Sequence, residues 1–229
     1  MPTTTPSLFA SITISDWVLI GTTLFLAGVA FVAPYVVEIL KYRFYSAKME
    51  FKFAHVPPDC HRTEMRGATT GFPVYYFRFR VLNKGKVQAE QCEAVLENIF
   101  KENSAGKLKE MQGFSPISLK WSGTQDSIYS TIQPGRESFC DIGRIHHPSH
   151  EPQSAYYDIQ PEEKRQNKFF FELPIRHYSQ WDCLTPGKYE VQISIYSKNA
   201  KKISKKFKIV WSGNWKDKES DMLNELSIS

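Results

Sequence analysis

The feature that most constrains this chain is a run of 21 residues without a charged side chain, from Trp17 to Val37, which Asp16 and Glu38 bracket. At ~1.5 Å per residue, a helix of this length spans the ~30 Å hydrocarbon core of a bilayer. A buried helix of this kind would be unusual in a soluble protein. The sequence therefore predicts one transmembrane helix over residues 16–43, preceded by a short N-terminal tail over residues 1–15.

The residues at both ends of the run are of the types that favour a membrane interface. Trp17 stands at one end, and Tyr35 and Tyr42 stand near the other. Lys41 and Arg43 can extend their charges to the lipid phosphates while their alkyl stems stay in apolar surroundings. We therefore expect Trp17, Tyr35, Lys41, Tyr42 and Arg43 to anchor the helix in the bilayer.

A secretory signal peptide is the alternative interpretation of the same run. Such a peptide carries a basic segment before an apolar stretch of ~7 to 15 residues. Residues 1–16 contain no Lys or Arg, and the apolar run is longer. A retained anchor is therefore the better interpretation, and N-terminal sequencing distinguishes the two.

The positive charges of the chain predict the direction of the helix. All 29 Lys and Arg residues lie beyond residue 40, and Lys41, Arg43, Lys48 and Lys52 follow the helix closely. The positive-inside rule then puts the N-terminus outside and the C-terminal domain in the cytoplasm. Four widely spaced cysteines without a CxxC pair fit that reducing compartment. Two glycines seven residues apart on roughly one helix face make homo-oligomer formation through the helix a candidate.

Residues 44–213 show the alternation of short β-strands separated by turn residues. Apolar side chains occupy every second position between Tyr75 and Val81, between Tyr189 and Ile195, and between Phe207 and Trp211. This period predicts strands with one buried face. About eight strands and no helical period of any length favour an all-β, antiparallel β-sandwich. A polar C-terminal tail, with at most a short helix around Asp221–Leu226, is expected over residues 214–229.

Two segments resemble a known type of domain. The segment Phe79–Cys92, with the sequence FRVLNKGKVQAEQC, looks like the strand, turn and strand of immunoglobulin-like β-sandwich domains of the cell-adhesion-related bacterial and archaeal type, in which a V-x-N-x-G turn recurs in an early hairpin. The segment Gly187–Val191 is similar to their closing hairpin, which a G-x-Y sequence opens. The resemblance implies an immunoglobulin-like fold, with a hairpin at Asn83, and carries no functional residue over to this chain.

Three histidines and a glutamate within six residues form the most suggestive chemical cluster. His146, His147 and His150 can bind zinc or another divalent ion if the loop folds back to supply three ligands and an open position. Adjacent histidines diverge in an extended chain, so a solvated loop is the alternative. Cys60 beside His61 is the nearest approach to a nucleophile with a base, but such neighbours usually point apart. No cofactor is predicted, because the chain has no phosphate-binding glycine loop and no hydrolase or HExxH motif.

Six lysines crowd the last predicted hairpin. On a cytoplasmic domain tethered at the bilayer, such a patch can contact anionic headgroups, with ~1 kcal/mol for each cation near the surface. Nucleic acid is a less favoured partner. Alternatively, lysines on an outer strand simply discourage edge-to-edge pairing. The residues are Lys198, Lys201, Lys202, Lys205, Lys206 and Lys208.

These features favour a single-pass membrane-anchored, non-catalytic binding or scaffold module that presents its β-domain to a protein partner. One alternative is a membrane-tethered sensor or effector whose domain binds a ligand and signals through the helix. The other alternative is a metal-dependent enzyme that uses the His146–His150 loop.

Overall fold

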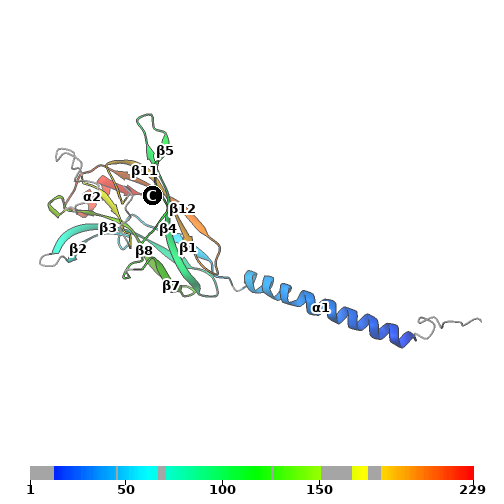
Figure 1. Cartoon of the computed structure of the whole chain (residues 1–229). Helices are drawn as coiled ribbons and strands as arrows, with labels where there is room; N and C mark the ends of the chain where they lie inside the picture. Colours follow the sequence, from blue (N-terminus) through cyan, green and yellow to red (C-terminus); the bar gives the residue numbers. More distant parts are fainter. Residues whose placement is uncertain (1–12, 45, 67–70, 125, 151–166, 175–181) are drawn as a thin grey trace, which may run out of the picture. The chain divides into compact units, whose positions relative to one another are not determined.

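A computed structural model of the chain describes residues 13–44, 46–66, 71–124, 126–150, 167–174 and 182–229. The chain divides into two compact units, Met1–Ser46 and Ala47–Ser229. The first unit contains helix α1, and the second contains two β-sheets with a short helix (Figure 1).

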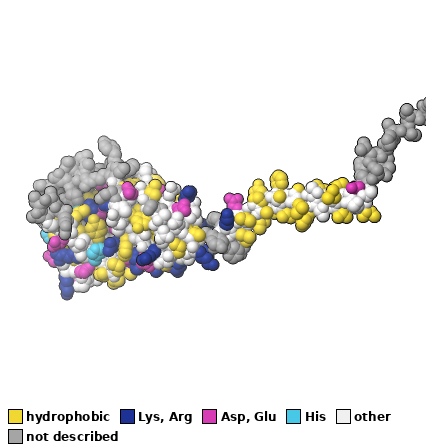
Figure 2. Space-filling view, turned by 90° about the horizontal axis from the view of Figure 1, so that it is seen from below, with side chains coloured by type: hydrophobic (Ala, Val, Ile, Leu, Met, Phe, Trp, Pro, Cys, Tyr) yellow, Lys and Arg dark blue, Asp and Glu magenta, His cyan; other side chains and the backbone are white. Residues whose placement is uncertain are grey.

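Helix α1 (Ile14–Phe44) extends slightly beyond both predicted boundaries. The backbone N–H and the hydroxyl of Thr13 donate to Oδ2 of Asp16 at 2.8 and 2.7 Å, and these hydrogen bonds stabilise the first turn of the helix. The stretch Ile14–Lys41 has a mean hydropathy of 2.0. Apolar side chains cover it, and its charged side chains lie near its ends (Figure 2). Helix α1 is therefore long and apolar enough to span a membrane or to serve as a signal sequence.

One sheet of the β-domain has six antiparallel strands. The order is β1-β3-β8-β9-β10, and β2 also pairs with β3. Because β8 pairs with β3 along most of its length, β1 and β2 share the opposite edge of β3. The strands are β1 (Met49–Lys52), β2 (Cys60–Arg66), β3 (Gly71–Asn83), β8 (Glu137–His146), β9 (Phe169–Phe171) and β10 (Cys183–Leu184).

The other sheet has seven antiparallel strands. The order is β13-β12-β11-β4-β5, and β6 and β7 also pair with β4. Two short helices complete the described secondary structure, η1 (Pro148–His150) and α2 (Glu219–Glu225). The strands are β4 (Ala89–Glu102), β5 (Leu108–Glu110), β6 (Ile117–Ser118), β7 (Ile128–Ile132), β11 (Gly187–Tyr196), β12 (Ile203–Trp211) and β13 (Leu226–Ile228).

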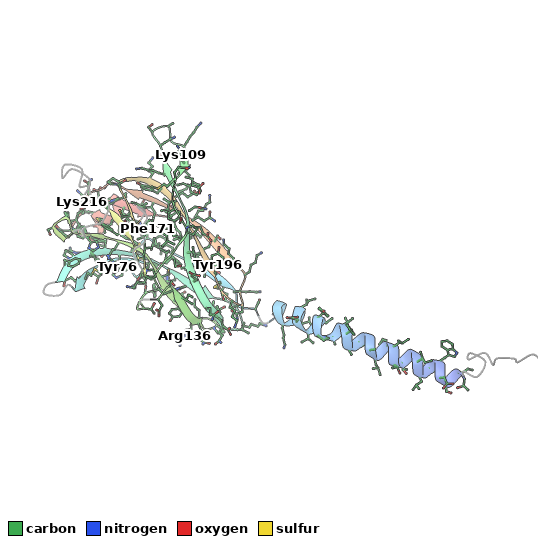
Figure 3. The ribbon with its side chains drawn as sticks, in the orientation of Figure 1. Tyr76, Lys109, Arg136, Phe171, Tyr196 and Lys216 are labelled. Carbon is green, nitrogen blue, oxygen red and sulfur yellow. The ribbon has the colours of Figure 1, made fainter. Side chains whose placement is uncertain are left out.

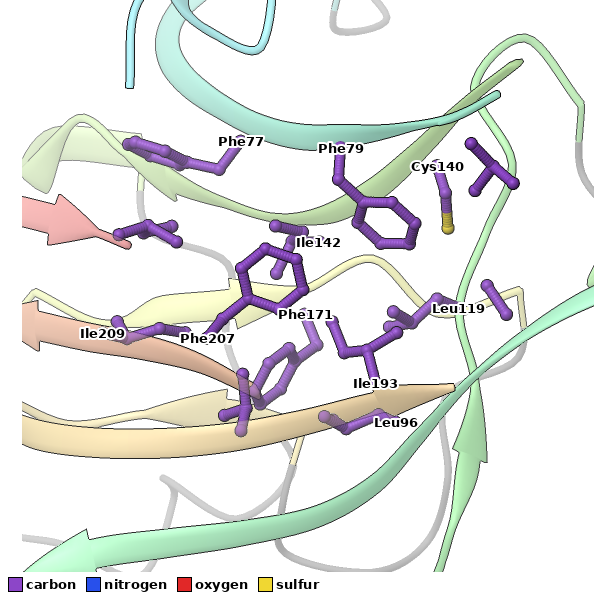
Figure 4. Packing of buried hydrophobic residues seen from close by; sticks show 14 of the residues in the cluster. Phe77, Phe79, Leu96, Leu119, Cys140, Ile142, Phe171, Ile193, Phe207 and Ile209 are labelled. Carbon is purple, nitrogen blue, oxygen red and sulfur yellow. The ribbon is translucent and has the colours of Figure 1, made fainter. Parts of the chain in front are cut away.

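The two sheets share one hydrophobic core, which confirms the all-β, antiparallel prediction. Phe77 and Phe79 of β3 face Phe207 of β12 across this core (Figure 4). The rings of Phe79 and Phe207 lie 5.9 Å apart between centroids. All three predicted alternating runs bury the expected residues, since the fractional exposures of their apolar side chains do not exceed 3%. The described residues form 13 strands instead of about eight, because strands of two or three residues show no readable period.

The hairpin expected at Asn83 is wrong, because β3 and β4 belong to different sheets. Oδ1 of the buried Asn83 side chain accepts hydrogen bonds from the backbone N–H groups of Lys48 (3.2 Å) and Gly85 (2.8 Å). Its Nδ2 donates to the carbonyls of Val87 (2.8 Å) and Ile132 (2.9 Å). The Asn83 side chain thus stabilises the segment that crosses between the two sheets. A buried amide whose hydrogen-bonding groups all have partners strongly restricts the local backbone.

Residues 214–229 contain the expected short helix and also a strand that was not expected. Helix α2 and strand β13 lie there, and β13 pairs with the end of β12. Met222, Leu226 and Ile228 are buried in the common core. These three apolar residues are scattered among polar neighbours, so their burial depends on a strand pairing that local sequence does not show.

Candidate binding cavity

A cavity of about 410 Å³ lies on the outer face of the six-stranded sheet. This volume is within the ~300–1,000 Å³ range of small-molecule sites. Four separate segments line it: β2, β3, β8 and the loop that follows β6. Tyr76, labelled in Figure 3, belongs to this face. The lining residues are His61, Thr63, Tyr76, Arg78, Lys120, Ser122, Gly123, Thr124 and Asp141.

Strand alternation turns the polar residues of β3 toward this cavity. Tyr75 and Phe77 are buried in the core, so Tyr76 and Arg78 lie on the opposite face. The register between β3 and β8 shifts between Phe77 and Arg78, and this irregularity leaves Arg78 directly opposite Asp141. Bulges of this kind often re-aim side chains next to functional sites.

Backbone hydrogen bonds to both sheets hold the loop that forms one wall. The N–H of Leu119 donates to the carbonyl of Ala94 in β4 at 2.7 Å. The N–H of Lys120 donates to the carbonyl of Glu172 at 2.9 Å, and its carbonyl accepts from the N–H of Asp141 at 2.9 Å. The segment therefore passes from one sheet to the other and fixes Lys120 beside β8.

Arg78 and Lys120 carry the positive charge of the cavity. Nε of Arg78 donates to the carbonyl of Pro58 at 2.9 Å, and its guanidinium carbon lies 4.4 Å from the ring centroid of Phe139. Within the described parts of the chain, neither Arg78 nor Lys120 forms a salt bridge. These two cations are held in position without being neutralised by an ion pair.

Asp141 supplies the carboxylate of the cavity. Burial raises its pKa, while a hydrogen bond from the Ser122 hydroxyl and the charges of Arg78 and Lys120 oppose that increase. A buried carboxylate whose pKa is raised costs free energy when it ionises. Its position next to two cations offsets part of that cost.

The rings of His61 and Tyr76 form an aromatic wall of the cavity. The two rings are nearly parallel, with centroids 6.5 Å apart and an interplanar angle of 24°. Burial lowers the pKa of His61, and the positive charge of Arg78 lowers it further. The imidazole is therefore neutral at pH 7, and the formal charge of the cavity comes from Arg78, Lys120 and Asp141.

The histidines predicted to bind a metal have separate partners. His146 is buried, and Nε of Arg144 donates to its Nε2 at 2.7 Å, so that lone pair is already engaged. Nδ1 of His147 lies 2.6 Å from the hydroxyl of Ser149. The side chain of His150 and residues 151–166 lie outside the described residues. Among those described, no group of three His, Cys, Asp or Glu residues is placed to hold a metal ion, and the metal site stays a prediction.

The six lysines of the predicted basic patch are partly compensated by glutamates of β4 and β11. Lys201, Lys205 and Lys208 form no salt bridge with any residue that the structure describes. Contact between these three and anionic headgroups stays a prediction. The ion pairs of the other three lysines are Lys198 with Glu90 (3.8 Å), Lys202 with Glu97 (2.9 Å) and Lys206 with Glu190 (2.7 Å).

The predicted membrane-anchor residues lie on α1. Trp17 and Tyr35 expose 60% and 68% of their surfaces, and Lys41 is exposed near the other end of the apolar stretch. The side chains of Tyr42 and Arg43 lie outside the part that the structure describes.

All four cysteines are buried, and Cys60, Cys92 and Cys140 carry free thiols. Burial is the main reason that the pKa rises to about 12 for Cys60 and to about 11 for Cys92, so both remain thiols at neutral pH. Cys60 lies in the core whereas His61 lines the cavity, because neighbours in a strand point to opposite faces. Cys92 and Cys140 are small residues of the hydrophobic core, with no exposed surface.

The sequence did not reveal the cavity, because strand pairing assembles it from segments far apart in the chain. One signal was available. Asp141 stands inside an otherwise mostly apolar run, Phe139–Ile145, and a carboxylate in a buried strand needs a compensating environment. Its partners Arg78 and Lys120 become evident only from the register of β3 with β8 and the path of the loop.

No protein-family model matches the chain, and no curated protein matches it. The chain is similar to a solved structure described as an X-ray structure of Northeast Structural Genomics Consortium target SoR45, with 11% sequence identity and a TM-score of 0.28. The match covers 76% of this chain and 94% of that chain. A similarity at this TM-score assigns neither a fold family nor a function.

Proposed function

We propose that this chain is a single-pass membrane protein in which α1 holds a non-catalytic binding or scaffold domain at the membrane surface. The observation that carries the proposal is the surface of α1, whose described side chains are all exposed up to Lys41. Apolar surface in water costs roughly 25 cal/mol per Å², so a helix of this kind requires an apolar environment. A bilayer supplies that environment over the whole length of the helix.

The β-domain is cytoplasmic in this proposal, and the N-terminus lies on the opposite side of the membrane. The support is the charge pattern, since Lys41, Arg43, Lys48 and Lys52 follow the apolar stretch and no cation precedes it. Four cysteines buried in one domain are also compatible with a reducing compartment.

The domain in this proposal is an immunoglobulin-like β-sandwich that binds a protein partner. Two antiparallel sheets around one core support the fold, as does the pairing of β11 with β12 from Gly187 to Trp211, where the sequence resembles the closing hairpin of that family. The β4–β5 hairpin projects from its sheet (Figure 1) and exposes Leu108, so it offers a surface to a partner.

A membrane-tethered sensor is the second candidate, and the cavity on the six-stranded sheet favours it. A cavity of this volume with convergent polar groups is a common setting for a small ligand. The two candidates share the anchor and differ in whether the domain recognises a protein or a small molecule.

Thiol labelling tests the anchor and its direction. The four native cysteines are buried, so a thiol reagent should not label them in the folded protein. Two single reporters, Ser15→Cys at the start of α1 and Ala105→Cys in the exposed β4–β5 turn, report on the two sides. In intact cells, an impermeant maleimide should label Ser15→Cys, and it should label Ala105→Cys only after permeabilisation.

The opposite labelling pattern would show that the domain is outside. A mature protein whose N-terminal sequence begins beyond α1 would show that the helix is a cleaved signal sequence. The unmodified chain is the matched control, because any labelling of it measures unfolding.

A further inference from the structure

We propose that the cavity on the outer face of the six-stranded sheet binds a small oxyanion, a carboxylate or a phosphate, through Arg78 and Lys120. The inference rests on the proposed role of the β-domain as a binding module. It does not depend on the direction of the anchor.

The guanidinium of Arg78 is pre-organised for this role. Its Nε is held by the carbonyl of Pro58 at 2.9 Å, and its backbone N–H donates to the carbonyl of Asp59 at 2.9 Å. The ring of Phe139 lies against the guanidinium carbon at 4.4 Å. These contacts fix the plane of the group and leave its Nη donors without a described acceptor. A planar fork of N–H donors matches the geometry of a carboxylate or phosphate.

Lys120 supplies the second cation from a different element. Its backbone is fixed by the hydrogen bonds with Glu172 and Asp141 described above. Lys120 and Arg78 therefore approach the cavity from the loop and from β3, respectively. Because both positions are set by backbone pairing, a bound anion does not have to order flexible chain, which lowers the free-energy cost of binding.

The charge balance of the cavity favours an anion. Two cations face one carboxylate, and Asp141 already accepts a hydrogen bond from Ser122. A cationic ligand would meet Arg78 and Lys120 at close range. The hydroxyl of Thr63 and the rings of His61 and Tyr76 complete a wall that suits a small polar molecule.

Isothermal titration calorimetry on the full chain in detergent micelles tests the proposal. The probes are inorganic phosphate and acetate, each titrated at constant ionic strength, and they distinguish the two oxyanion classes. We expect saturable binding of at least one probe. Arg78→Met and Lys120→Met should each weaken it about tenfold or more, because each removes a charged hydrogen-bond donor.

Lys109→Met is the matched control. Lys109 is exposed on β5 and does not line the cavity, so this variant removes the same charge and should leave the affinity unchanged. Asp141→Asn provides an independent readout with the opposite sign. It removes the negative charge of the cavity and should tighten anion binding several-fold, whereas a merely structural role for the cluster predicts no gain.

The proposal is overturned if neither probe binds saturably to the folded chain, or if Lys109→Met weakens binding as much as Lys120→Met does. Folding of each variant is checked by its cooperative thermal transition. A folded chain that binds neither anion would leave the membrane-anchor proposal intact, because thiol labelling tests that proposal separately.

Discussion

The outer faces of the two sheets both carry basic side chains, and each face has some cations with a carboxylate partner and some without. On the seven-stranded sheet, Lys206 pairs with Glu190 on the adjacent strand at 2.7 Å, and Lys202 pairs with Glu97 at 2.9 Å. On the six-stranded sheet, the cations of the cavity have no carboxylate in salt-bridge range among the described residues. A dense run of lysines in a sequence therefore does not locate a binding site, because the positions of the acids decide which charges remain available.

The same contrast occurs within strand β3. Nε of Arg80 lies 2.8 Å from Oδ1 of the buried Asp59, and its Nη1 donates to Oε2 of Glu137 at 3.1 Å. Arg78 is two residues away on the same face and donates instead to a backbone carbonyl. Arg80 thus stabilises the fold, whereas Arg78 remains able to bind a ligand.

The largest expected effect separates these two arginines. Arg80→Met should lower the free energy of unfolding by about 3 kcal/mol, because it leaves the carboxylate of Asp59 buried without its cation. Arg78→Met should cost about 1 kcal/mol, since it removes one hydrogen bond and one ring contact. Urea unfolding of the full chain in detergent measures both values, and equal losses would break the comparison.

The next effect is a pH dependence of opposite sign on the two sheets. Because burial raises the pKa of Asp141, the native state binds this proton more readily than the unfolded state. The unmodified protein should therefore lose stability as the pH rises from about 4 through the native pKa. Asp141→Asn should remove this loss and be more stable than the unmodified protein at pH 7, as urea unfolding at pH 4 and pH 7 measures.

Glu97 on the seven-stranded sheet should show the reverse behaviour. Burial alone would raise its pKa, but hydrogen bonds from Tyr196 and Lys202 outweigh burial and lower it. Its contribution to stability is present at pH 7 and is lost as the pH falls through the native pKa. Glu97→Gln should cost about 0.5 kcal/mol at pH 7, because the pair is partly screened. The difference should vanish in acid, and unfolding free energies at pH 3 and pH 7 measure it.

The smallest effect concerns the lysines of β12. Lys206→Met removes an ion pair and Lys208→Met does not, but the lysine side chains are exposed in both cases. We expect each substitution to change the free energy of unfolding by less than ~0.5 kcal/mol. A loss near 2 kcal/mol for Lys206→Met alone would show that the pairs on this sheet support the fold more strongly than exposed pairs usually do.

The buried strands were predictable because alternation is a local property. Phe77 in β3, Ile193 in β11 and Phe207 in β12 each stand in a run with a period of two, and all three are buried. Pairing partners are not local. The strand that pairs with β3 along most of its length is β8, more than fifty residues later, and this is why the hairpin expected at Asn83 was wrong.

By itself, the sequence determined that an apolar helix precedes an antiparallel β-domain, because hydropathy and side-chain period act over a few neighbouring residues. Only the tertiary structure decided which charges are compensated. Arg78, Lys120 and Asp141 come from three distant segments, and they meet because strand register and a loop between the sheets bring them to one cavity. Coulomb interactions depend on distance in space, which the order of residues along the chain does not supply.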